Sequence, residues 1–129
     1  MKKILLSLLI IGIGFSLFGC LGSNKAEGYE SISQEAAKKL MDSNPNCIIL
    51  DVRSQEEFIT GHIPKAICIP HDEIKAEAPK KLLDKSQLIL VYCRTGRRIK
   101  IASQTLANMQ YTNVKEFGGI TTWKYGTVK

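Results

Sequence analysis

A cysteine lies between an apolar run and a helical repeat, and this arrangement constrains the fold more than any other part of the chain. The run Leu88–Tyr92 is short, continuous and rich in β-branched and aromatic residues, which is typical of a buried parallel strand. Ile99, Ala102 and Leu106 then recur at a helical spacing. We therefore expect Cys93 at the carboxyl end of a strand, in a tight turn that opens onto a helix N-terminus.

The turn after this cysteine is strongly basic and contains a glycine. It consists of Arg94, Thr95, Gly96, Arg97 and Arg98. The N–H groups of such a turn and of a first helical turn lack partners inside the helix, so they favour an anion. Helix N-termini and positive charge also favour the reactive thiolate of a cysteine. The pattern predicts a nucleophilic cysteine that meets an anionic substrate; the alternative is a buried small residue beside a solvated basic face.

The amino-terminal segment has the composition of a targeting signal. Lys2 and Lys3 precede the apolar stretch Ile4–Phe18, which is short for a permanent membrane span. The residues Leu17-Phe18-Gly19-Cys20 resemble the bacterial lipobox. We expect residues 1–19 to be a lipoprotein signal peptide; an uncleaved anchor is the alternative.

This resemblance implies that Cys20 becomes the lipidated first residue of the mature protein. Residues 20–28 are small and polar and read as a flexible tether. Residues 29–129 then form one domain of ordinary size. The expected location is extracytoplasmic, with the domain held at the cell membrane by its lipid.

The net charge of +6 does not indicate a nucleic-acid-binding protein. Such a protein needs a basic stripe with interleaved aromatic residues, whereas the lysines here are scattered. Pairs such as Lys38-Lys39 and Lys80-Lys81 read as solvated helix faces. We expect no nucleic-acid partner.

Two of the four cysteines have no assigned chemistry. Cys47 and Cys68 each lie in an apolar run, where a free cysteine behaves as a small hydrophobic residue. An oxidising compartment would also permit a disulfide between them. The sequence leaves both possibilities open.

Strands and helices alternate along the chain and predict an α/β domain. The expected strands are Tyr29–Ile32, Cys47–Val52, Ala66–Ile69, Leu88–Tyr92 and Val114–Phe117. They should form a mainly parallel five-stranded sheet flanked by helices on both faces. A ligand would bind beyond the carboxyl ends of the strands, where Cys93 falls.

The expected helices carry recognisable start and stop signals. Ser33 caps the first, and Ser54–Glu57 is a capping box that begins the second. A helical stretch over Asp72–Leu83 is interrupted by Pro79, and the helix after the cysteine turn runs to about Asn108.

Seven short segments, in this order and spacing, resemble a single-domain rhodanese, a thiosulfate-type sulfurtransferase. They are Asp51-Val52-Arg53, Glu57-Phe58, Gly61-His62-Ile63-Pro64, Ala66–Pro70, Cys93–Arg98, Gly118-Gly119 and Trp123.

The resemblance implies that Cys93 carries sulfur as a persulfide and that Arg94–Arg98 form a cradle of N–H groups around it. Asp51, Arg53, Glu57 and His62 are then structural residues near the site, and Trp123 is a packing residue. The implied donor is a small anion such as thiosulfate, and the acceptor is cyanide or a thiol. No metal or cofactor is implied, and we expect a monomer. His62 and His71, nine positions apart, make a poor metal signature.

The chain departs from the family pattern at a few positions. Lys65 replaces a common glycine and Cys68 a common asparagine, which suggests altered local packing. Ile99 replaces a frequent serine, so a helix-start hydrogen bond is expected to be missing. Arg97 makes the cradle more basic than usual.

Two other functions compete with sulfur transfer. Rhodanese-like phosphatases and arsenate reductases use a loop one residue longer, whereas here four residues separate Cys93 from Arg98. The other possibility is a persulfide carrier or sensor without turnover, which would use the same cysteine.

Overall fold

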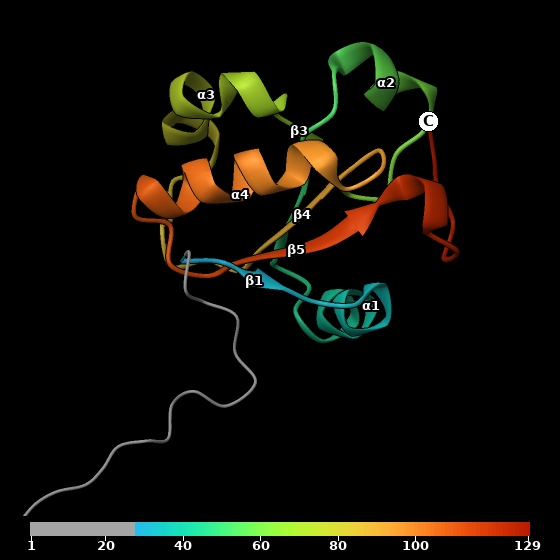
Figure 1. The fold of residues 1–129 in the computed structure, drawn as a ribbon. Helices are drawn as coiled ribbons and strands as arrows, with labels where there is room; N and C mark the ends of the chain where they lie inside the picture. The colour runs from blue at the N-terminus through green and yellow to red at the C-terminus, as the bar shows by residue number, and fades with distance from the viewer. Residues whose placement is uncertain (1–27) are drawn as a thin grey trace, which may run out of the picture.

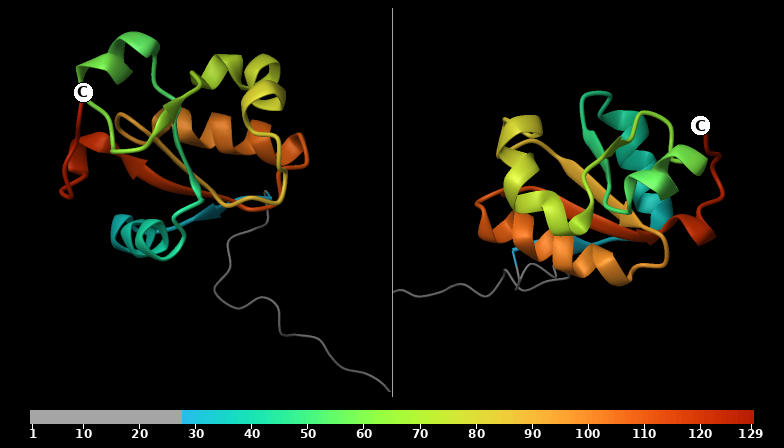
Figure 2. Two further views of the ribbon diagram at one scale, coloured as in Figure 1. Left: turned by 180° about the vertical axis from the view of Figure 1, so that it is seen from behind. Right: turned by 90° about the horizontal axis from the view of Figure 1, so that it is seen from above.

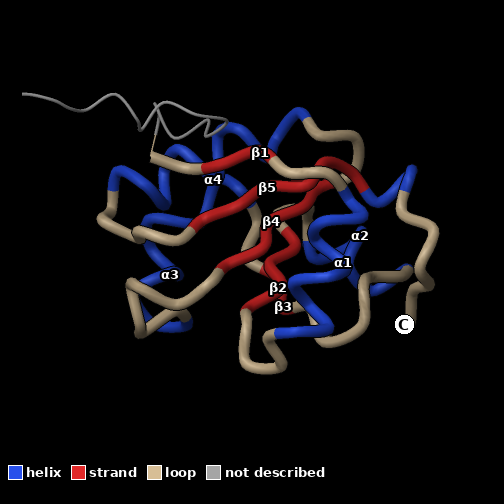
Figure 3. The backbone as a smooth tube through the Cα atoms, turned by 90° about the horizontal axis from the view of Figure 1, so that it is seen from below, coloured by secondary structure: helices blue, strands red, loops and turns tan. Residues whose placement is uncertain are grey.

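The computed structural model of the chain describes residues 28–129. Five strands of this part form one sheet in the order β1-β5-β4-β2-β3, and every neighbouring pair is parallel. Figure 3 shows them side by side. Their bounds are Glu30–Ser31 for β1, Ile48–Asp51 for β2, Ile67–Cys68 for β3, Ile89–Cys93 for β4 and Val114–Gly119 for β5. The expected α/β fold with a five-stranded sheet is confirmed.

Helices cover both faces of this sheet. Their bounds are Gln34–Ser43 for α1, Gln55–Thr60 for α2, Ile74–Lys81 for α3 and Arg97–Asn108 for α4, with 3-10 turns at His71–Glu73 and Ile120–Thr122. α3 and α4 lie together on one face, and α1 lies on the other (Figures 1 and 2).

β4 lies at the centre of the sheet, and this position explains why apolar and polar residues do not alternate along it. All its residues are buried. Ile89 and Val91 belong to the apolar cluster that includes residues of α3 and α4. Leu90 and Tyr92 belong to the cluster that includes Ala37 of α1. A strand covered on both faces needs apolar residues at every position.

The starts of α1 and α2 agree with their predicted caps. The Ser33 hydroxyl accepts a hydrogen bond from the Ala36 N–H at 3.0 Å. Ser54 and Glu57 form the reciprocal capping box, with the Glu57 carboxylate accepting from the Ser54 N–H at 3.1 Å. Gly61 ends α2 as the residue after its last turn.

The prediction that Pro79 interrupts its helix is wrong. α3 continues through Pro79 to Lys81. Pro79 has no N–H to donate to the carbonyl four residues before it, so α3 continues despite the loss of one helical hydrogen bond. The helix end is also anchored, because the Leu82 N–H donates to the Ala78 carbonyl at 2.7 Å and the Tyr111 hydroxyl donates to the Leu82 carbonyl at 2.7 Å.

All strands point the same way, so their carboxyl ends meet at one edge of the sheet. β1, the first element of the described domain, begins at the opposite edge (Figure 1). No helix within residues 28–129 is long and apolar enough to cross a membrane. The expected signal peptide and Cys20 lie outside the described residues.

Candidate active site

Cys93 is the last residue of β4 and is completely buried. It pairs with Gly119 of β5 after a register shift that follows Val91. Its sulfur accepts a hydrogen bond from the Gly96 N–H at 2.9 Å. Gly96 has a φ of 104°, a left-handed conformation that glycine adopts without strain, and it directly precedes α4. The turn thus folds back over the sulfur and aims a backbone donor at it.

The end of β5 and the 3-10 turn that follows it contact the cysteine turn and hold it in place. The Thr121 N–H donates to the Arg94 carbonyl at 3.2 Å. A Cβ atom on Gly119 would lie 2.2 Å from the Arg94 carbonyl oxygen. The Glu116 carboxylate accepts from the Gly118 N–H at 3.0 Å and fixes the approach to Gly119. The motif Gly118-Gly119 could have indicated a close backbone approach, but the sequence did not show that its partner is the cysteine turn.

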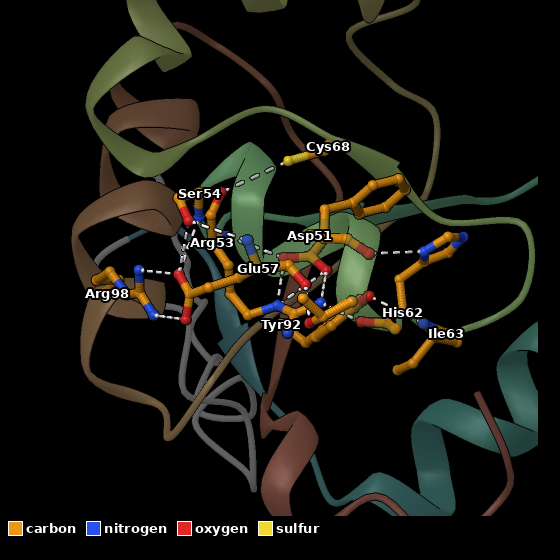
Figure 4. A network of polar contacts seen from close by, with 12 residues as sticks. Asp51, Arg53, Ser54, Glu57, His62, Ile63, Cys68, Tyr92 and Arg98 are labelled. Carbon is orange, nitrogen blue, oxygen red and sulfur yellow. Dashed lines mark hydrogen bonds and ion pairs between the residues drawn. The ribbon is translucent and has the colours of Figure 1, made fainter. Parts of the chain in front are cut away.

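Arg98 forms a two-pronged ion pair with Glu57. Its Nη1 and Nη2 atoms donate to the two carboxylate oxygens at 2.8 and 3.1 Å. The hydrogen bond from Arg98 lowers the pKa of Glu57 to about 2; burial opposes this shift, and Ser54 adds to it. The pair ties the first turn of α4 to α2 (Figure 4). Arg98 is therefore a structural cation as well as part of the basic turn.

The remaining basic residues of the turn face solvent. Arg94 and Arg97 are exposed, as is Thr95 between them in the turn. Within residues 28–129, no hydrogen bond or ion pair engages the guanidinium of Arg94 or Arg97. A cleft of about 340 Å³ lies beside the turn, lined by His71, Arg94, Thr95, Arg97, Arg98 and Ile101. This cleft can attract an anion and bring it to the turn that covers Cys93.

Asp51 and Arg53 form a buried pair away from the cleft lining. Arg53 donates to Asp51 through Nε at 2.9 Å and through Nη2 at 2.6 Å. The same Nη2 donates to the Gly61 carbonyl at 2.7 Å. The pair therefore connects β2 to the turn that follows α2 (Figure 4).

The turn with His62 is held by contacts outside the cleft lining. The His62 ring stacks on Phe58 with centroids 3.8 Å apart, and its Nδ1 lies 3.0 Å from the Phe58 carbonyl oxygen. Its backbone pairs with Val128 in both directions at 2.8 Å. The Tyr92 hydroxyl accepts from the Ile63 N–H at 3.0 Å. These contacts give His62 a part in joining α2 to the C-terminal segment.

Each departure from the family pattern has a local consequence. Lys65 has a φ of 73°, the left-handed region where a glycine is free of strain. Ile99 is buried, and α4 begins without a side-chain capping bond.

Cys68 and Cys47 are free thiols, so the disulfide left open by the sequence is not formed. Burial raises the pKa of both thiols, and that of Cys68 to about 11. Residues 28–129 contain no group of three His, Cys, Asp or Glu side chains placed to hold a metal.

A family model described as a rhodanese-like domain matches residues 33–125. This chain belongs to the rhodanese-like domain family. It is 35% identical over 92 residues to a putative sulfur carrier protein, YrkF, of Bacillus subtilis. That match covers 71% of this chain and 49% of YrkF, so the chain spans about half the length of this relative.

Two relatives are named as thiosulfate sulfurtransferases. PspE of Escherichia coli is 37% identical over 71 residues, which cover 55% of this chain and 68% of PspE. Thiosulfate sulfurtransferase 18 of Arabidopsis thaliana is 34% identical over 109 residues, which cover 75% of this chain and 79% of that protein. These relatives support a sulfurtransferase kind of activity for the rhodanese-like domain described here.

A solved structure entitled "rhodanese with anions from E. coli" shares the fold. It has a TM-score of 0.60 and 34% sequence identity to this chain. The match covers 64% of this chain and 96% of that one.

Proposed function

We propose that the protein moves sulfane sulfur from thiosulfate, or a similar small anion, to a thiol or cyanide through a persulfide on Cys93. The observation that carries this proposal is the hydrogen bond of 2.9 Å from the Gly96 N–H to the Cys93 sulfur, within a turn whose arginines line a cleft. A backbone donor aimed at sulfur stabilises a thiolate and, after transfer, a persulfide.

The reaction proceeds in two displacements. The Cys93 thiolate attacks the outer sulfur of thiosulfate, the sulfur–sulfur bond of the donor breaks, and sulfite leaves with its electron pair. The acceptor, as cyanide or a thiolate, then attacks the outer sulfur of the Cys93 persulfide. Thiocyanate or an acceptor persulfide leaves, and the Cys93 thiolate is regenerated.

The dimensions of the turn favour sulfur over larger oxyanions. Only four residues separate Cys93 from Arg98, and the Gly96 N–H already closes on the sulfur. Arg98 is also engaged by Glu57, whereas hydrolysis of a phosphate ester or reduction of arsenate needs donors free to surround a tetrahedral group. Phosphatase activity above that of Cys93→Ser would contradict this argument.

A sulfur carrier without turnover is the second candidate, because one relative is named a putative sulfur carrier protein. The two candidates share the persulfide and differ in its release. An enzyme turns over many times with cyanide, whereas a carrier stops after one sulfur until its partner arrives.

The test incubates the full-length protein with thiosulfate and measures the mass of the Cys93 peptide, the release of sulfite and the formation of thiocyanate. We expect one added sulfur on Cys93 and repeated turnover, both lost in Cys93→Ser. Cys47→Ser is the matched control, because that thiol is partly exposed but does not line the cleft. Persulfide formation without turnover would favour the carrier, and unchanged turnover in Cys93→Ser would refute both.

We also propose that Cys20 carries lipid and holds the domain at the outer face of the cell membrane. The support is the sequence Leu17-Phe18-Gly19-Cys20 after a basic and apolar leader. Each buried acyl methylene contributes about 0.8 kcal/mol, so two chains anchor a protein stably. Metabolic labelling with a fatty acid should mark the wild type and not Cys20→Ala. An unlabelled wild-type protein recovered from the cytosol would refute the assignment.

A further inference from the structure

His71 stands at the edge of the sheet where the strands end. It follows the buried residues Ile69 and Pro70 after β3, and its N–H donates to the Val52 carbonyl at 3.0 Å. β3, β2 and β4 are neighbours in the sheet, so His71 and Cys93 follow strands that end at the same edge. The backbone of His71 is therefore fixed beside the candidate site.

His71 lines the cleft together with Arg94, Arg97 and Arg98. It is partly exposed, and within residues 28–129 its ring makes no hydrogen bond or ion pair. The other histidine, His62, is stacked on Phe58 and is absent from this lining. His71 is thus a free imidazole at an arginine-lined opening.

The charges around His71 come from three neighbouring segments. The cysteine turn and α4 supply the three arginines, and Glu57 of α2 pairs with Arg98. The remaining charged groups on its own turn and on the start of α3 do not line the cleft; they are Asp72, Glu73, Lys75 and Glu77. An imidazolium at this position therefore adds one positive charge to a cleft lined by cations.

We propose that His71 is the anion-recognition residue of the donor step, so that the site takes dianionic sulfur donors faster as His71 becomes protonated. This inference rests on the proposed function. When the Cys93 thiolate attacks thiosulfate, a monoanion approaches a dianion, and sulfite leaves with the electron pair of the broken bond. A further cation at the opening reduces this repulsion and donates a hydrogen bond to the sulfonate oxygens. An uncharged donor gains nothing from it.

The first test measures the rate at which Cys93 reacts in single turnovers at pH 5.5 and pH 8, with thiosulfate and with an uncharged dialkyl trisulfide. Thiosulfate forms the Cys93 persulfide as sulfite leaves, whereas the trisulfide forms an alkyl disulfide on Cys93 as the alkyl perthiolate leaves. Unperturbed histidines titrate near pH 6.5. For thiosulfate we expect the wild type to exceed His71→Gln about fivefold at pH 5.5 and to match it at pH 8, since a partly exposed charge acts through screened water. With thiosulfate, His71→Lys should react faster than His71→Gln at both pH values. With the trisulfide, the wild type and both variants should react at the same rate at each pH.

His62→Gln is the matched control, because the chain has only two histidines. The ratio of its rate with thiosulfate to its rate with the trisulfide should depend on pH as it does in the wild type, even if the variant changes both rates. A His71→Gln variant whose rate ratio to wild type does not change with pH for thiosulfate would overturn the proposal.

The second test follows the two imidazoles by NMR in full-length Cys93→Ser, with and without sulfate, which stays dianionic over this pH range. We expect sulfate to move the titration midpoint of His71 to higher pH and to leave that of His62 in place, a response that a purely structural residue would not give. An unmoved His71 midpoint refutes its role in anion recognition. Absence of a persulfide in every variant refutes the proposed function instead, and the sulfate titration still decides the role of His71.

Discussion

Replacing Gly119 with alanine should distort the cysteine turn through a single methyl group. The added Cβ would lie 2.2 Å from the Arg94 carbonyl oxygen and 2.7 Å from the Thr95 Cα, both far inside van der Waals contact. Gly119 has φ −119° and ψ 154°, which alanine adopts freely, so the effect is steric and not conformational. The clashing atoms are backbone and cannot rotate away. The turn or the end of β5 must therefore move.

The expected loss of stability is that of overpacking in a close-packed site, about 1–3 kcal/mol. For a domain of this size that corresponds to a fall in Tm of about 5–20 °C. Displacing Arg94 also breaks its hydrogen bond from Thr121 and shifts the Gly96 N–H away from the Cys93 sulfur. Removing a backbone donor from a reacting atom costs at least about tenfold in rate, so sulfur transfer per folded molecule should fall by that factor or more.

The assay combines thermal unfolding with sulfur transfer from thiosulfate, normalised to the folded fraction. Gly126→Ala is the control: its Cβ would meet no atom within 4 Å, but its φ of 99° imposes backbone strain, so it lowers stability without a clash at the cysteine turn. We expect Gly126→Ala to lower Tm and to keep its rate per folded molecule. A Gly119→Ala protein with wild-type Tm and rate would refute the close approach on which this reasoning rests.

Three further predictions concern the polar contacts around the site. Arg53→Ala should lower stability by about 3–5 kcal/mol in urea unfolding, because it leaves the Asp51 carboxylate buried without its partner; a loss below about 1 kcal/mol would refute the buried pair. Glu57→Gln should lower Tm most above about pH 4.5 and progressively less as the pH falls toward 2. The reason is that the ionised Glu57 carboxylate, whose pKa is lowered in the folded protein, stabilises the fold until it is protonated. A Tm difference between variant and wild type that does not change with pH would contradict this. Tyr92→Phe should cost about 1–3 kcal/mol in the same urea assay by leaving the buried Ile63 N–H without an acceptor, and a neutral effect would show that another group takes its place.

The elements defined by local signals were predictable from the sequence. The strand before Cys93, the helix after it and the caps at Ser33 and Ser54 each depend on residues a few positions apart. The position of Cys93 at the carboxyl edge also follows, since parallel strands in an α/β domain end together. The resemblance to rhodanese supplied the family.

The contacts between distant segments could not be predicted in the same way. Arg98 and Glu57 are 41 residues apart, and the sequence indicated neither their pairing nor the double role of Arg98. The close approach of Gly119 to Arg94 depends on a register shift between β4 and β5, and the sequence did not show which segment Gly119 would meet. The predicted interruption at Pro79 is wrong because Tyr111 anchors the end of α3, and this tertiary contact outweighs the low helix propensity of proline.

The parallel direction of the strands also places the candidate site and the start of the described domain at opposite ends of the sheet. The described part of the chain begins just before β1, at the amino ends of the strands (Figure 1). The cleft lies beside the turn that follows β4, at their carboxyl ends. If Cys20 carries lipid as proposed, the tether would join the domain at the end away from the arginine-lined cleft. The anchor would then leave the cleft uncovered, so that dissolved anions and thiols could reach the cysteine turn while the domain stays tethered.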